Sequence, residues 1–307
     1  MADILAIGEP MIEFNQVCAN HPEFLQGFGG DTSNAIIAAA RQGARTAYYT
    51  RVGVDAFGDR LLQLWREEAV DTAMVQRDAQ AATGVYFVTH GAGGHQFSYL
   101  RAGSAASRMT PADLPHDAIR QAQWLHVSGI SQAISATACD AVFEAIATAR
   151  QAGVRVSYDA NLRLKLWPLA RASAIIRATV GMSDLFLPSL EDAQQFTGLA
   201  DAQAILDWCW SAGARTVVLK LGKDGAIVAT PGRQALVPGH TVQAVDATGA
   251  GDCFAGALLA RLVAGDALED AAQYANAAAA LTTTGFGAVA PIPTPQAVHA
   301  LLQGDKG

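Results

Sequence analysis

Ten consecutive residues decide the fold of this chain: Val245-Asp246-Ala247-Thr248-Gly249-Ala250-Gly251-Asp252-Cys253-Phe254. A strand-like segment at 241–245 precedes the small residues, and an apolar, helix-like segment at 254–263 follows them. Gly249 and Gly251 allow backbone angles that are closed to other residues, so that consecutive N–H groups can converge on one point. At the N-terminus of a helix, where the dipole also favours negative charge, such a loop binds anions. We therefore predict a phosphate-binding loop between a strand and a helix.

Asp252 lies at the mouth of the same predicted helix. Its carboxylate would lie beside a site prepared for a phosphate group, where it could take part in chemistry. A structural interpretation is equally open, because an acidic side chain near a helix N-terminus gains about 0.3 to 1 kcal/mol from the helix dipole. The pattern by itself supports both interpretations.

Two better-known phosphate motifs are excluded by inspection. The chain contains no G-x-x-x-x-G-K-[ST], and the spacing of Gly249, Gly251 and Gly256 is not G-x-G-x-x-G. The first predicted strand, residues 4–7, runs into Gly8-Glu9-Pro10 without a dinucleotide fingerprint. The sequence therefore indicates neither a P-loop enzyme nor an NAD-dependent enzyme.

Residues 246–252 resemble the C-terminal signature of the PfkB (ribokinase-like) carbohydrate kinases, which is usually D-T-x-G-A-G-D. Residues 29–35, with Gly43 nine positions after Asn34, resemble the N-terminal signature of the same family, and more than two hundred residues separate the two motifs. The resemblance covers essentially the whole chain. It implies one α/β domain over residues 1–307, with a ribokinase-like three-layer αβα core, a mostly parallel central sheet and a small β-sheet lid from about 10–28 and 83–102.

The pattern of predicted elements agrees with this fold class. From residue 123 onward, apolar strand patterns alternate with helices predicted at 136–151 and 169–180, which is typical of a parallel sheet covered on both faces. Earlier in the chain, alternating segments at 83–90 and 96–101 flank Gly91-Ala92-Gly93-Gly94 and predict a hairpin.

Composition limits the possible partners. The chain has 307 residues, of which 51% are hydrophobic and 16% charged, with a net charge of −7. We expect no nucleic-acid binding, because there is no basic stripe, and no membrane span, because no apolar run reaches about 18 residues. Four scattered cysteines and seven unclustered histidines give no metal motif, so we predict no direct metal ligands. Residues 1–8 lack a basic segment with a cleavage site, so with no membrane span we expect a cytoplasmic location.

The resemblance also implies a sugar site. In the family, the loop that contains Gly30, Asp31 and Asn34 hydrogen-bonds the sugar hydroxyls, whereas Thr32 and Ser33 are expected to cap a helix. Gly8-Glu9-Pro10 resembles the sugar-acid and fructose kinases of the family more than its ribokinases. The residues around Tyr86, Tyr99 and Arg101 look like the 2-keto-3-deoxygluconate kinases of the family, in which equivalent residues bind the sugar acid. An arginine and two phenols suit a carboxylate and its neighbouring keto oxygen, although both tyrosines could simply pack in a strand. Ile130 is added to this sugar site because residues 128–130 follow a predicted strand.

For ATP, the resemblance implies a second set of residues. Arg163 matches the family arginine between the sugar and the transferred phosphate, and surface pairing with a carboxylate is its alternative role. Where the family has N-x-x-E, this chain has Ser189 and Asp192. The predicted ATP-binding residues are Asn161, Arg163, Ser189, Lys220, Gly222, Lys223, Gly225, Thr248, Gly249, Gly251 and Asn276.

The expected activity is phosphoryl transfer from ATP, with Mg²⁺ and possible activation by a monovalent cation, to the C6 hydroxyl of 2-keto-3-deoxygluconate. Asp252 would be the base, and Arg163 and the amides of Gly249, Ala250 and Gly251 would stabilise the transferred phosphate. A kinase of fructose, ribose or a nucleoside is the alternative enzyme, and a catalytically silent sugar sensor is the alternative from another class. We expect a homodimer or higher homo-oligomer formed through the lid.

Overall fold

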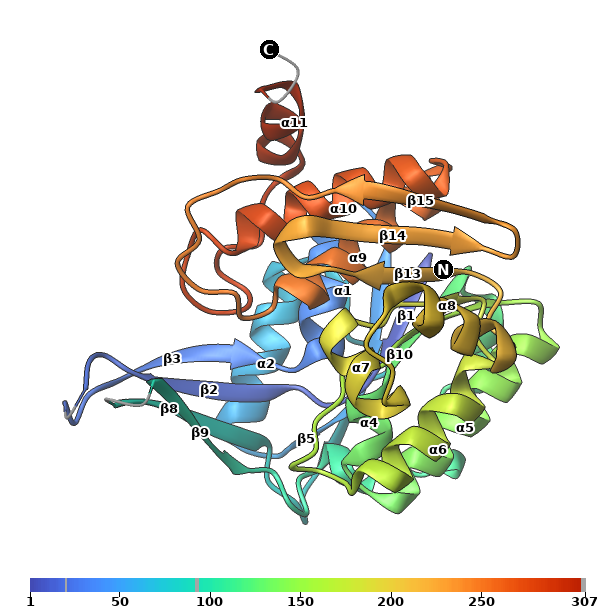
Figure 1. Ribbon diagram of the computed structural model, residues 1–307. Coiled ribbons are helices and arrows are strands. Elements are labelled where there is room, and N and C mark those ends of the chain that lie inside the picture. Colours follow the sequence, from blue (N-terminus) through green and yellow to red (C-terminus); the bar gives the residue numbers. More distant parts are fainter. Residues whose placement is uncertain (20, 92–93, 305–307) are drawn as a thin grey trace.

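The computed structural model describes residues 1–19, 21–91 and 94–304 (Figure 1). The strands are β1 (Ile4–Ile7), β2 (Met11–Gln16), β3 (Phe24–Gly29), β4 (Thr46–Tyr49), β5 (Arg51–Gly53), β6 (Val70–Asp71), β7 (Gln76–Asp78), β8 (Gly84–Gly91), β9 (Gly94–Leu100), β10 (Trp124–Ser128), β11 (Arg155–Asp159), β12 (Leu185–Phe186), β13 (Val217–Lys220), β14 (Gly225–Thr230) and β15 (Arg233–Pro238). The α-helices are α1 (Asp31–Arg41), α2 (Ala56–Glu67), α3 (His116–Gln121), α4 (Gly129–Ala133), α5 (Ala136–Gln151), α6 (Leu169–Val180), α7 (Leu190–Thr197), α8 (Ala202–Ser211), α9 (Ala250–Ala264), α10 (Leu268–Thr282) and α11 (Pro295–Gly304). Short 3₁₀ helices are η1 (Ala106–Arg108), η2 (Pro111–Asp113) and η3 (Gly222–Asp224).

The central sheet has nine strands in the order β15-β14-β13-β12-β11-β10-β1-β4-β6. Its pairs are parallel from β13 to β6, while β13 with β14 and β14 with β15 are antiparallel. The carboxyl ends of the parallel strands therefore lie at one edge, where ligands of open α/β sheets bind. The predicted α/β class with a mostly parallel sheet is confirmed.

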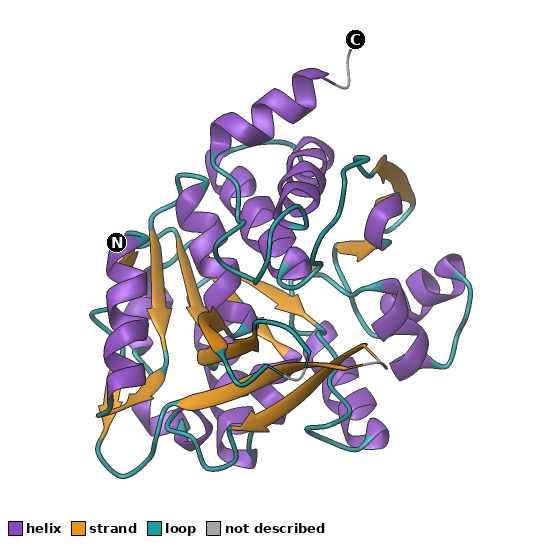
Figure 2. Cartoon of the chain, turned by 90° about the vertical axis from the view of Figure 1, so that its left-hand side faces the viewer, coloured by secondary structure: helices purple, strands orange, loops and turns teal. Residues whose placement is uncertain are grey.

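Helices cover both faces of the central sheet (Figures 1 and 2). Successive strand side chains point to opposite faces, so along β1 Ile4 and Ala6 pack in one apolar cluster while Leu5 and Ile7 pack in the other. The first cluster contains side chains of α1, α2, α9, α10 and α11, and the second contains side chains of α3, α5, α6, α7 and α8. The result is a three-layer αβα core.

A second, four-stranded sheet in the order β3-β2-β8-β9 stands beside the core, and we call it the lid sheet (Figure 1). β2 pairs antiparallel with β3 and parallel with β8, and β8 pairs antiparallel with β9. As the alternation predicts, Val85 and Phe87 pack against the main core, whereas Tyr86 and Val88 form a small cluster with Met11. Of the predicted hairpin turn, Ala92 and Gly93 lie outside the described residues.

One predicted element was wrong, and several elements were not predicted. Residues 241–245 form no strand; the strand before this segment is β15. The patterns described above do not include β3, an edge strand whose small and polar residues pair with β2. They also do not include β15, α7 and α8, or the division of the chain after residue 45 into β4 and β5, which pair in different sheets.

Candidate active site

Helix α9 begins directly after Gly249, which adopts a left-handed conformation with φ of 76°. A Cβ atom at this position would lie 2.8 Å from the Ala288 Cβ, so both conformation and space require glycine here. Gly251 differs from the prediction, because its φ is not positive. A Cβ on Gly251 would meet only the Lys220 Nζ, at 3.6 Å, so this glycine keeps the helix N-terminus open toward a lysine.

Asp246 fixes the loop that leads into α9. Its Oδ1 accepts hydrogen bonds from the Thr248 backbone N at 2.9 Å and from the Thr248 hydroxyl at 2.6 Å. Its Oδ2 accepts one from the Gly287 backbone N at 2.9 Å. The Thr248 hydroxyl, predicted to bind ATP, thus donates within the protein. We had not assigned Asp246 a role, although an Asp two residues before a Thr is a recognisable signal for such a turn.

Asp252 joins α9 to α1, because the Asn34 Nδ2 donates to the Asp252 Oδ2 at 2.8 Å. The Asn34 Oδ1 is buried and has no hydrogen-bond partner in the described part of the chain, so it is available to a donor from a ligand. Burial, reinforced by the charge of Asp31, raises the pKa of Asp252 to about 8, against the lowering effect of the Asn34 hydrogen bond. Burial therefore favours the protonated form of this carboxyl group in the free protein.

Charged groups meet at the ends of β11 and β13. The Lys220 Nζ donates to the Asp159 Oδ2 at 2.6 Å, and both side chains are mostly buried. Asn161 follows β11 with a φ of 32°, which is rare outside glycine, and its Nδ2 donates to the Asp31 Oδ2 at 2.9 Å. Because the Asn161 backbone N also donates to the Asp159 Oδ1, at 3.2 Å, these bonds connect Asp31, in the N-terminal signature, with Lys220, beside Gly251. Asp159 was not among the predicted site residues; its position at a strand end was the available signal.

Two glutamates hold the predicted lid residues. The Tyr86 hydroxyl donates to the Glu13 Oε2 at 2.5 Å, and the rings of Tyr86 and Tyr99 lie 5.7 Å apart. The Arg101 guanidinium forms an ion pair with Glu9, which also accepts a 2.7 Å hydrogen bond from the Ser104 hydroxyl. Burial raises the pKa of Glu9, while Arg101 and Ser104 oppose that rise. Both glutamates are buried, and neither was predicted.

A family model described as pfkB family carbohydrate kinase matches residues 1–295. The chain belongs to this family. The 2-dehydro-3-deoxygluconokinase of Bacillus subtilis (strain 168) is 33% identical over 312 residues, covering 99% of this chain and 96% of the relative. Probable fructokinase-4 of Arabidopsis thaliana is 34% identical over 318 residues, covering 98% and 97%.

Solved structures agree with the assignment. The fructokinase of Vibrio cholerae O395, determined with fructose, ADP and calcium ion, superimposes with a TM-score of 0.89 at 32% identity, covering 98% of this chain and 99% of that one. This protein is therefore a carbohydrate kinase with a ribokinase-like fold. Because 2-dehydro-3-deoxygluconokinases and fructokinases are similar to it to the same degree, the comparisons leave its sugar open.

The remaining residues that were predicted to bind the sugar lie near the ends of β1 and β10. Gly30 precedes α1 with φ of 110°, and a Cβ there would lie 2.3 Å from the Glu9 carbonyl oxygen. Gly30 is the N-cap residue of α1, which makes Asp31 the first helical residue and corrects the expected cap at residues 31–33. Ile130 is buried in α4.

The remaining residues predicted for ATP fall into two groups. Asn276 donates to the Val237 and Pro238 carbonyl oxygens at 3.1 Å, and Gly225 pairs with Pro238 in the sheet, so these residues meet at the end of β15. The exposed Lys223 lies in η3, beside Gly222. The second group lies across the site. Ser189 caps α7, Asp192 accepts a 3.0 Å hydrogen bond from the Leu162 backbone N, and Arg163 is exposed.

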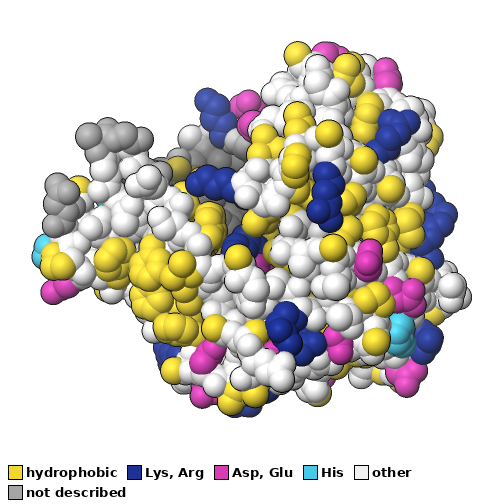
Figure 3. Space-filling model, turned by 90° about the horizontal axis from the view of Figure 1, so that it is seen from below, with side chains coloured by type: hydrophobic (Ala, Val, Ile, Leu, Met, Phe, Trp, Pro, Cys, Tyr) yellow, Lys and Arg dark blue, Asp and Glu magenta, His cyan; other side chains and the backbone are white. Residues whose placement is uncertain are grey.

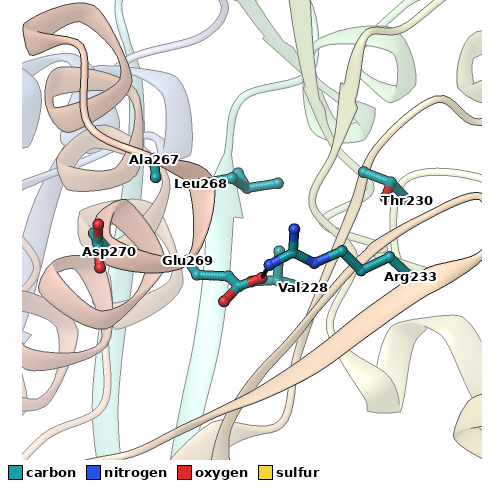
Figure 4. Close-up of a pocket in the computed structure, with 7 residues that line it drawn as sticks. All are labelled: Val228, Thr230, Arg233, Ala267, Leu268, Glu269 and Asp270. Atoms are coloured by element: carbon teal, nitrogen blue, oxygen red, sulfur yellow. Dashed lines mark hydrogen bonds and ion pairs between the residues drawn. The ribbon is translucent and has the colours of Figure 1, made fainter.

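A pocket of about 250 Å³ lies elsewhere, between β14, β15 and the start of α10 (Figure 4). Arg233 bridges part of it by an ion pair with Glu269 at 2.6 Å. None of the predicted site residues lines this pocket. In the part of the chain that the structure describes, no cluster of three potential metal ligands occurs, and no helix is long and apolar enough to cross a membrane.

Proposed function

We propose that this kinase transfers the γ-phosphoryl group of ATP to the primary, C6 hydroxyl of a sugar acid, with 2-keto-3-deoxygluconate as the substrate. The observation that carries the proposal is the Asn34–Asp252 hydrogen bond at the N-terminus of α9. It places a carboxyl group and an amide with a free buried oxygen together, beside a helix end that favours phosphate. A sugar hydroxyl bound to this amide would be within reach of the carboxylate.

In the proposed reaction, the C6 oxygen forms a bond to the γ-phosphorus while the bond from that phosphorus to the β–γ bridging oxygen breaks. Asp252 accepts the proton that the hydroxyl loses, and ADP leaves. Positioned proton transfer of this kind contributes about 10² to 10⁴ in rate. The backbone N–H groups at the start of α9 and the Lys220 ammonium lie where they would stabilise the negative charge of the transferred group.

The residues present fit ATP with a divalent cation. Gly251 leaves the N-terminus of α9 open, and Lys220 adds a positive charge there. Magnesium usually keeps several waters and binds through phosphates and one or two carboxylates, so the lack of a cluster of three ligands among the described residues is consistent with it. When bound, the cation would neutralise phosphate charge. The carboxylates that could help to hold it are those of Asp159, Asp192 and Asp252.

The sugar-acid assignment is supported by the lid. Tyr86, Tyr99 and Arg101 lie together, with the Arg101 guanidinium 5.6 Å from the Tyr99 ring centroid. The start of β8 lies against the sugar motif, because a Cβ on Gly29 would be 2.5 Å from the Tyr86 hydroxyl. With C6 at Asp252, the carboxylate at the opposite end of the sugar would lie beside Tyr86, Tyr99 and Arg101.

Fructose is the second candidate, and one observation favours it. Because Glu9 already pairs with Arg101, this arginine is less available to a substrate carboxylate than the sequence motif alone implies. A catalytically silent sugar sensor is less well supported, because the chain belongs to a family of kinases and keeps Asp252 at the N-terminus of α9.

A panel of sugars tests these alternatives. ATP turnover is measured with 2-keto-3-deoxygluconate, gluconate, fructose, ribose and a nucleoside, at saturating ATP and Mg²⁺. We expect the highest kcat/KM with 2-keto-3-deoxygluconate. Turnover confined to neutral sugars would refute the sugar-acid assignment, and tight sugar binding without turnover would establish the sensor.

We also propose that the kinase forms a homodimer through the lid sheet. Hydrophobic side chains gather on the lid side of the molecule in the view of Figure 3. On the lid sheet itself, Leu25 and Leu100 are each 66% exposed, which is unusual for large apolar residues of a sheet. A monomeric mass by light scattering at micromolar protein would refute this assembly.

A further inference from the structure

The positive charge of Arg101 is already matched within the protein. Its guanidinium Nη2 donates to the Glu9 carboxylate, which is completely buried, while the Arg101 side chain is only 10% exposed. The Ser104 hydroxyl binds the other oxygen of Glu9 at 2.7 Å. A substrate carboxylate that binds at the lid would have to share this guanidinium with Glu9, so a second cation would strengthen its binding.

Lys165 supplies a cation at the same place from a different part of the chain. Its Nζ lies 5.9 Å from the Tyr99 ring centroid, so Lys165 and Arg101 both approach this one tyrosine. No carboxylate among the described residues forms an ion pair with Lys165. Tyr99 is 37% exposed, so a ligand can reach the space beside it.

The backbone around Lys165 is fixed. The Leu166 N donates to the Arg163 carbonyl oxygen at 2.9 Å and closes a turn with Lys165 inside it. Leu162 and Trp167, on either side of the turn, are 5% and 3% exposed and anchor it in the core. Viewed from below, the lid is separated from the body by a hollow with Lys and Arg side chains at its margin (Figure 3).

We propose that Lys165 is a specificity-determining residue that selects acidic over neutral sugars by pairing with the substrate carboxylate beside Tyr99. This inference rests on the proposed sugar-acid function. A lysine ammonium is a compact charge on a flexible stem, so it can adjust to a carboxylate that binds beside Tyr99. Glu9 holds Arg101 in place, and Lys165 provides the charge that the substrate neutralises.

The test compares kcat/KM for 2-keto-3-deoxygluconate and for fructose in the wild type and in three variants. Lys165→Met should lower the preference for the acid about tenfold, the effect of losing one partly exposed charge-assisted contact. Lys165→Arg should keep the preference within about threefold of the wild type, because the charge remains. The control Arg66→Met removes one charge from an exposed residue of α2 and should leave the preference unchanged.

Two failures are distinguishable. If the wild type prefers the acid and Lys165→Met keeps that preference, the role of Lys165 is refuted while the proposed function stands. If the wild type itself uses only neutral sugars, the proposed function fails, and this inference fails with it. Where fructose turnover is too slow, calorimetric Kd values for both sugars replace kcat/KM, with the same expected ratios.

Discussion

The central sheet and the lid sheet position functional side chains with very different amounts of support. Asp159 and Lys220 end strands that are covered on both faces by large apolar clusters, and they bind each other at 2.6 Å. On the face of the lid sheet that carries Tyr86, the buried cluster among the described residues is Met11, Tyr86 and Val88, with Phe97 packed against it. Segments with few buried apolar contacts open and move most readily. From this difference we propose that the core fixes the phosphoryl transfer, while the lid, together with Lys165 beside Tyr99, sets the choice of sugar.

Removing the proposed base should have the largest effect. We expect Asp252→Asn to lower kcat about 10² to 10⁴-fold, because the hydroxyl proton loses its acceptor. Asp270→Asn is a matched control, since both residues are third in helices of 15 residues. If Asp252 served only the helix dipole, both variants would lose the same small stability and keep their turnover.

The next largest effect should be the pH dependence of kcat/KM, which reports on the free enzyme. With a pKa of about 8 for Asp252, kcat/KM should fall about tenfold for each pH unit below that value, and about 100-fold by pH 6. A profile flat from pH 6 to 9 would mean that the base titrates elsewhere.

The same group links pH to stability. Its folded pKa exceeds the ordinary value of 3.8, so the folded protein holds this proton over a pH range in which the unfolded chain has lost it. Its contribution to stability is therefore lost as pH rises toward and through about 8. Asp252→Asn should melt above the wild type at pH 9, while both should melt alike near pH 4.

Substitutions of the two glycines in the predicted phosphate-binding loop should separate an effect of backbone conformation on stability from an effect of side-chain bulk on ATP binding. Gly249→Ala should lower the free energy of unfolding by about 2 kcal/mol, because φ is 76° and the new Cβ meets Ala288. Gly251→Ala should change stability by less than about 0.5 kcal/mol, since the space beside it is open, yet raise the KM for ATP. Equal melting temperatures for the two variants, measured by calorimetry, would contradict this division.

In the lid, the expected effect is smaller and confined to the sugar. Tyr86→Phe removes the hydroxyl that binds Glu13 and should raise the sugar KM about fivefold, a typical loss for one hydrogen bond, with the KM for ATP unchanged. A lower kcat with an unchanged sugar KM would mean that Tyr86 takes part in phosphoryl transfer, which would contradict the proposed division between the core and the lid.

The sequence predicted the core better than the lid. Helices α5 and α6 begin and end at the predicted residues, because long amphipathic patterns specify a helix locally. Family motifs led to Asp252 and Asn34, and the structure brings these two residues together from positions 218 apart. The roles of the two residues stay predictions.

Pairings over long distances in the sequence could not be foreseen. Glu13 and Tyr86 are 73 positions apart, and Glu9 and Arg101 are 92 apart, so no local pattern shows that a buried glutamate holds each lid residue. The predicted strand at 241–245 failed for a related reason: its backbone bonds to a distant residue outside the sheets, with the Val245 N donating to the Thr283 carbonyl oxygen at 2.7 Å.

A crystal structure with 2-keto-3-deoxygluconate and a non-hydrolysable ATP analogue tests the central claim most directly. We predict the C6 hydroxyl within hydrogen-bonding distance, about 2.6 to 3.2 Å, of the Asp252 carboxylate, and the sugar carboxylate beside Tyr99. A sugar bound in the reverse orientation, or an Asp252 carboxylate turned away from the hydroxyl, would contradict the account.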